Sequence, residues 1–69
     1  MLKSNIKDLM TQKNSTIRGL AVETGISTKT IIRARSDKWI AECRLSTLRR
    51  IAEALGVEVK ELFEEEKSS

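Results

Sequence analysis

Four side chains between residues 28 and 33 fall where a short helix would present them together. Lys29, Ile32 and Arg33 recur at spacings of three and four residues, which places them on one helix face. Thr28 lies obliquely beside them at the exposed start of that helix. Lysine and arginine can donate hydrogen bonds to guanine O6 and N7, and a branched apolar side chain can contact a thymine methyl group. This helix face could therefore recognise DNA bases through hydrogen bonds and apolar contacts to their edges.

The sequence on either side, residues 16–36, predicts two short helices joined by a tight turn. Thr16 can act as the N-cap of the first helix, because its hydroxyl oxygen can accept from a free backbone N–H. Gly25 is expected to end that helix in the left-handed conformation, and Ser27 to cap the second helix. The inward-facing positions of the two helices are Ile17, Leu20, Ala21, Thr24, Ile31 and Ala34. Such a pair predicts a DNA-binding helix-turn-helix with its second helix in the major groove.

Two stretches of the chain resemble the phage-repressor-like regulators of the Cro/C1 or Xre type. The first is the helix-turn-helix run from Leu20 to Arg33 (LAVETGISTKTIIR). The second, from Leu45 to Phe63 (LSTLRRIAEALGVEVKELF), resembles the two closing helices of that domain. The resemblance covers residues 3–63 and implies an all-α, compact five-helix domain of the lambda-repressor-like type that binds operator DNA, usually as a dimer. Ile17 stands where the family often has a phosphate-clamping glutamine, so no side-chain clamp is expected there.

The remaining helices are predicted from apolar spacing and caps. We expect a first helix over residues 5–13 capped by Ser4, a fourth over residues 45–55 with Leu45 inward, and a fifth over residues 59–65. Gly56 ends the fourth helix. The helix-turn-helix domain then spans residues 1–64, and residues 65–69 form a short acidic tail.

Charge is distributed unevenly along the chain. Residues 1–50 carry eleven lysines and arginines against four acidic residues, a net charge of +7, whereas residues 51–69 carry two lysines against six glutamates, a net charge of −4. This asymmetry favours a basic face for a polyanion and an acidic end that points away from it. Residues that could set the register on DNA phosphates are Thr30, Arg35, Lys38 and Arg44.

Other classes of function find little support in the composition. With no histidine and one cysteine, we expect no metal site, no cofactor and no internal disulfide, and no nucleophile–base pair indicates an enzyme. No apolar stretch approaches the ~20 residues that span a bilayer, and no small-molecule site is evident, so a cytoplasmic protein is expected.

Three residues allow two interpretations each. Ile32 could contact a thymine methyl group or pack against the following loop. Trp39 could cover the small core, or it could stack on DNA sugar or join a dimer contact. Cys43 is most simply a small buried hydrophobe, with an intermolecular redox switch as the alternative.

The leading hypothesis is a sequence-specific regulator of transcription, a repressor of a phage, a mobile element or a bacterial operon. It would bind double-stranded operator DNA as a homodimer, in contact through the fifth helix with Val57, Val59 and Phe63 or through the Trp39 loop. The alternative is a protein-interaction module, such as the antitoxin of a toxin–antitoxin pair, that binds through its acidic end.

Overall fold

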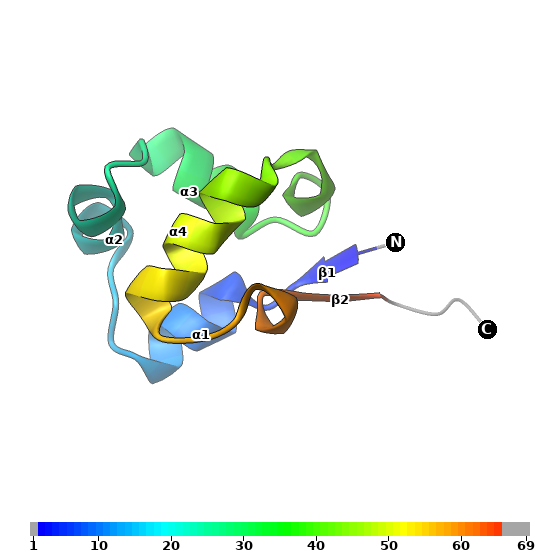
Figure 1. Cartoon of the computed structure of the whole chain (residues 1–69), viewed down its shortest axis with the longest axis horizontal. Coiled ribbons are helices and arrows are strands. Elements are labelled where there is room, and N and C mark those ends of the chain that lie inside the picture. The colour runs from blue at the N-terminus through cyan, green and yellow to red at the C-terminus, as the bar shows by residue number, and fades with distance from the viewer. Residues whose placement is uncertain (1, 66–69) are drawn as a thin grey trace.

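The computed structural model describes residues 2–65, which form a small, mostly helical fold with a short two-stranded sheet at one end (Figure 1). The α-helices of this part of the chain are α1 (Ile6–Gln12), α2 (Ile17–Thr24), α3 (Thr28–Ala34) and α4 (Leu45–Leu55). Two single 3-10 turns are η1 (Ile40–Glu42) and η2 (Val59–Glu61). The strands β1 (Leu2–Ser4) and β2 (Phe63–Glu65) pair antiparallel. The predicted helical class is confirmed, whereas the predicted count of five helices is wrong.

One hydrophobic core holds α3 in place. Figure 1 shows α4 running through the middle of the molecule, where it packs against α2, and α2 in turn packs against α3. The buried apolar side chains come from every helix: Ile6, Met10, Leu20, Ile26, Ile31, Ala34, Ile40, Leu48, Ile51, Ala52, Leu55 and Leu62. Fully burying one isoleucine or leucine is worth about 1.5–3 kcal/mol, so α3 is fixed mainly by Ile31 beneath its exposed face.

The turn between α2 and α3 is built as the sequence predicts. The hydroxyl of Thr16 accepts from the Gly19 N–H at 3.0 Å and caps α2. Gly25 ends α2 in the left-handed region, with φ of 73°, and its N–H donates to the Ala21 carbonyl. A side chain with a Cβ rarely adopts such a φ, which explains glycine at this position. Ile26 is buried beneath the turn.

The C-terminal end differs from the predicted fifth helix. Only Val59–Glu61 forms a 3-10 turn, and the chain then extends into β2, in which Glu64 lies opposite Lys3. Continuing the helix would gather glutamates at its negative end, which is unfavourable. Beside the paired strands the Asn5 N–H donates to the Leu62 carbonyl at 2.8 Å, and across them Lys3 Nζ lies 3.8 Å from Glu64 Oε1. Glu65, the first residue of the predicted tail, belongs to β2, and residues 66–69 lie outside the described part of the chain.

Two smaller predictions near the helix starts differ from the structure. Ser4 belongs to β1, and the N-cap residue of α1 is Asn5, which makes no side-chain cap hydrogen bond. The prediction holds in part, because the Ser4 hydroxyl accepts from the N–H of Ile6, the first residue of α1, at 3.4 Å. The same hydroxyl donates to the Ala34 carbonyl at 2.7 Å, and the Ser4 N–H donates to Asp37 Oδ1 at 2.7 Å. Leu45, predicted to face inward, is 63% exposed because it opens α4 ahead of the first core residue, Leu48.

Candidate nucleic-acid interface

The outer face of α3 carries the four side chains predicted to read bases. Ser27 is the N-cap residue of this helix, and its hydroxyl accepts from the Thr30 N–H at 3.2 Å. Ile31 and Ala34 are buried on the inner side. The exposed residues on the other side are Thr28, Lys29, Ile32 and Arg33. The structure therefore places all four on the solvent side of one capped helix.

The far end of α3 is tied to the N-terminal strand. The Ala34 carbonyl accepts from the Ser4 hydroxyl, and Ser4 is buried. Asp37, three residues further along the chain, accepts from the Ser4 backbone N–H. The two ends of the described chain meet in the β1–β2 sheet, so the sheet holds the C-terminal end of α3. The sequence did not predict this anchor, because Ser4 resembled a helix cap.

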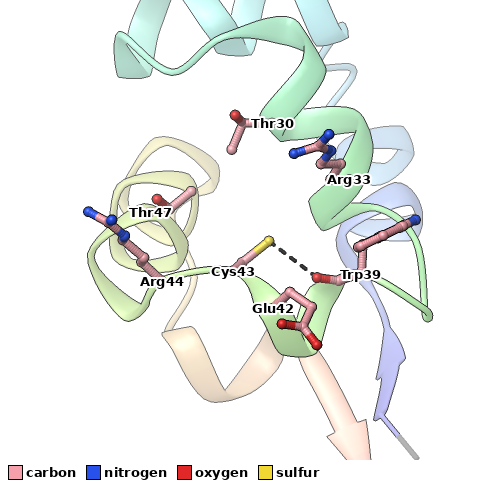
Figure 2. A pocket seen from close by; sticks show the side chains of 7 residues that line it. All are labelled: Thr30, Arg33, Trp39, Glu42, Cys43, Arg44 and Thr47. Atoms are coloured by element: carbon pink, nitrogen blue, oxygen red, sulfur yellow. Dashed lines mark hydrogen bonds between the residues drawn. The ribbon is translucent and has the colours of Figure 1, made fainter.

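A hollow of about 420 Å³ lies beside Arg33, between α3, η1 and the start of α4. Figure 2 shows Thr30 and Arg33 on the α3 side of the hollow and Arg44 and Thr47 on the α4 side. Trp39, Glu42 and Cys43 complete its wall. Arg44 is the N-cap residue of α4, and its side chain makes no capping hydrogen bond. Two arginines and the partly positive start of a helix give this hollow an electrostatic preference for an anionic group, which Glu42 weakens.

The residues predicted to contact phosphates do not form one cluster. Thr30 and Arg44 line the hollow, although the Thr30 hydroxyl already lies 2.9 Å from the Ser27 hydroxyl. Arg35 is the half-buried C-cap residue of α3, and Lys38 is exposed in the following loop. Neither Arg35 nor Lys38 lines the hollow. Thr47, which does line it, was not among the predicted residues, since no sequence signal separates it from other surface threonines.

Trp39 does not lie over the core, which was one of the two interpretations of this residue. The residue is 45% exposed, so the interpretation that it covers the core is wrong. The neighbouring Ile40 is the buried residue of this loop. The Arg33 guanidinium carbon lies 5.8 Å from the centroid of the indole ring, and Lys38 Nζ lies 5.6 Å from it. The signal available in the sequence for these ring contacts was a tryptophan directly after Lys38 and a short distance after the outward Arg33.

The exposure of Ile32 and the contacts of Cys43 bear on the two interpretations that each residue allowed. Ile32 is 55% exposed, which leaves much of the side chain free for a contact outside the domain. Cys43 is half-buried, and its thiol donates to the Trp39 carbonyl at 3.6 Å. Burial raises the pKa of this thiol, and the positive charge of Arg33 only partly opposes that effect. A neutral thiol is a poor nucleophile, so the structural interpretation of Cys43 is favoured over a redox switch.

Ile17, the first residue of α2, offers no side-chain donor for a phosphate clamp. Ile17 is half-buried and packs against the core, as expected for an inward residue. Residues 2–65 contain no group of three or more His, Cys, Asp or Glu side chains that could hold a metal ion. None of the helices in the same part of the chain has the length and apolar character needed to span a bilayer.

Comparison with known proteins agrees with this geometry. Residues 5–68 match the Cro/C1-type helix-turn-helix DNA-binding domain. The chain is similar to the crystal structure of a candidate DNA-binding protein from Bacteroides fragilis, with 34% sequence identity and a TM-score of 0.77. That similarity covers 93% of this chain and 100% of the other. No curated protein matches. Since the family match spans nearly the whole chain, the protein belongs to the Cro/C1-type helix-turn-helix family of DNA-binding domains.

Proposed function

We propose that this protein regulates transcription, as a repressor of a phage, a mobile element or a bacterial operon, by binding a specific double-stranded operator in the cytoplasm. The observation that carries the proposal is the exposed face of α3, on which two cations and two smaller side chains lie opposite buried Ile31 and Ala34. A helix of this kind fits the major groove, where each base pair presents a distinct set of donors and acceptors.

Each residue of this face has a proposed role. Lys29 and Arg33 donate to guanine O6 and N7, since both are exposed residues of the outer face of α3, where Arg33 also borders the hollow. Ile32 contacts a thymine methyl group, which its exposed apolar surface favours. Thr28, at the first turn, donates to or accepts from a base edge.

The DNA backbone lies against the sides of this face. Thr30 and Arg44 contact phosphate at the hollow of about 420 Å³ between α3 and α4, where the two arginines of its wall outnumber Glu42. Arg35 and Lys38 contact the backbone beyond the C-terminal end of α3. Contacts of this kind fix the register and strengthen binding to every sequence alike.

A homodimer on two inverted half-sites about 34 Å apart completes the proposal. One short helix contacts too few base pairs to define a unique operator. Half-buried Val57 and Val59 border a shallow groove beside α4, and Phe63, also half-buried, begins β2. These side chains supply the apolar contact that a second copy needs.

Selection of bound sites from random duplex DNA, followed by footprinting of the selected site, tests the proposal. We expect enrichment of an inverted repeat, with protection of two half-sites one helical turn apart. A short unrepeated site in a 1:1 complex would contradict the dimer. If no duplex is bound at low salt and a specific protein partner co-purifies instead, the alternative of a protein-interaction module is favoured.

A further inference from the structure

Trp39 stands at a fixed place between the loop and the outer face of α3. Its N–H donates to the Ser36 carbonyl at 3.2 Å, and its carbonyl accepts from the Glu42 N–H at 2.9 Å. The next residue, Ile40, is buried in the core. The backbone that carries the indole is therefore held on both sides, although the ring itself is partly exposed.

The indole ring lies close to two cations of different kinds. Arg33 belongs to the outer face of α3, and its guanidinium carbon is 5.8 Å from the ring centroid. Lys38 belongs to the loop, and its Nζ is 5.6 Å from the same centroid. Both distances fall within the range of about 6 Å at which a cation is attracted to an aromatic face. Arginine adds a planar group that stacks on aromatic rings, which the lysine ammonium cannot do.

We propose that Trp39 is a positioning residue for base recognition, because its ring holds the Arg33 guanidinium near the orientation in which it meets the major groove. This inference rests on the proposed role of Arg33 as a base reader. A long arginine side chain loses rotamer freedom when it binds, and a ring that restricts those rotamers beforehand reduces the loss. Trp39 thus contributes to specificity without touching a base.

The test measures affinity for cognate, single-mismatch and random duplexes at several salt concentrations. Trp39→Ala should weaken cognate binding by about two- to five-fold per bound domain, the effect expected of one exposed cation–π contact. Binding to random DNA and the slope of affinity against salt should stay unchanged, because no phosphate contact is lost. Trp39→Phe, which keeps a ring face, should recover most of the cognate affinity, whereas Trp39→Leu, which keeps apolar bulk alone, should not.

Double-mutant cycles show whether the effect of Trp39→Ala on cognate affinity depends on Arg33 or on Lys38. In an Arg33→Ala background, Trp39→Ala should have no further effect on cognate affinity. In a Lys38→Ala background it should keep its full effect. Thermal unfolding of each variant shows whether the protein is folded. If Trp39→Ala unfolds, the comparison of Trp39→Leu with Trp39→Phe carries the test, because only the phenylalanine keeps a ring face for Arg33.

Several results would overturn the positioning role. It fails if Trp39→Leu binds like the wild type, since bulk alone would then suffice. It also fails if Trp39→Ala weakens cognate and random DNA equally with a flatter salt slope, because Trp39 or Lys38 would then act on the backbone. If the wild type itself shows no preference among duplexes, the proposed function fails. Selective wild-type binding that no Trp39 variant changes rejects only the positioning role.

Discussion

Two glycine turns of this protein are nearly alike in geometry and lead to different structures. Gly25 ends α2 with φ of 73°, and Gly56 ends α4 with φ of 71°. After Gly25 the chain starts a seven-residue α-helix, capped by the Ser27 side chain. After Gly56 it makes a single 3-10 turn, closed by Glu58 and Glu61, and then a strand. A glycine therefore fixes where a helix stops, while the residues that follow decide what comes next.

The difference between the two regions lies in the range of their interactions. The start of α3 is set by contacts three residues apart, such as the Ser27 hydroxyl accepting from the Thr30 N–H. The C-terminal region is set by pairing with the other end of the chain, through β1 and through the Asn5 N–H that donates to the Leu62 carbonyl. The regions differ in charge as well, since the surface of α3 is basic and β2 carries exposed glutamates. The same fold thus separates a basic surface from an acidic end.

The largest expected effects on stability come from Gly25→Val and Gly56→Val. A branched side chain at either φ is strained by about 1–3 kcal/mol, a large share of the ~5 kcal/mol typical of a small domain. A Cβ at either position meets no atom within 4 Å, so only the backbone conformation should matter and the two losses should be similar. Urea unfolding compares them. An unchanged midpoint for either variant would contradict the shared geometry of the turns.

Ser4→Ala tests the link between the sheet and α3. The change leaves the Ala34 carbonyl without its hydroxyl donor and the Ile6 N–H without the Ser4 oxygen, which should cost about 1–3 kcal/mol of unfolding free energy. Thr11→Ala is the matched control, because the Thr11 hydroxyl also donates to a backbone carbonyl but is exposed. Its loss should stay within about 0.5 kcal/mol. Equal losses of unfolding free energy for the two variants in urea would contradict a special role of Ser4 in linking the sheet to α3.

Ser27→Ala should have a smaller effect, since one N-cap is worth about 1 kcal/mol. Glu58→Ala, at the corresponding place after Gly56, should cost less, because Glu58 caps a single exposed 3-10 turn. Thermal unfolding of both variants measures the difference. A larger loss for Glu58→Ala would mean that local capping also determines the C-terminal region.

The smallest expected effect concerns the ion pair across the strands. Lys3 and Glu64 are both partly exposed with 3.8 Å between their charged atoms, so Glu64→Gln should change the unfolding free energy by less than about 0.5 kcal/mol. Added salt should change wild type and variant almost alike. A loss well above that value at low salt would show that charge, more than backbone pairing, holds β2.

The sequence was informative where structure depends on neighbouring residues. Caps at Thr16 and Ser27, and the left-handed Gly25, follow from side-chain chemistry within one turn and were predicted correctly. The predicted fifth helix was wrong because helical spacing near Leu62 is compatible with a strand as well, and only the distant β1 decides between them. Leu45 was misplaced because the first residue of a helix lies ahead of the stripe that reaches the core.

The candidate site likewise has one part that the sequence predicted and another that it could not predict. The exposed face of α3 could be predicted from periodicity, because buried Ile31 and Ala34 fix the opposite side. The hollow beside it could not, because it joins Thr30 on α3 to Thr47 on α4 across a loop. The ring contact between Trp39 and Arg33 depends on the path of that loop, which apolar spacing does not specify.

The central claim is that α3 reads bases while its surroundings hold the backbone, and affinity for cognate, mismatched and random duplexes at several salt concentrations tests it most directly. Lys29→Ala and Arg33→Ala should each lose about 1–3 kcal/mol on the cognate site and relax the preference at one base pair. Arg44→Ala should weaken all duplexes alike and flatten the salt dependence by about one counterion. Ile32→Ala should lose discrimination for thymine with an unchanged salt slope, because a methyl contact releases no ion. If Lys29→Ala and Arg33→Ala instead weaken specific and non-specific binding equally, α3 is not the reading element and the proposed placement on DNA is wrong.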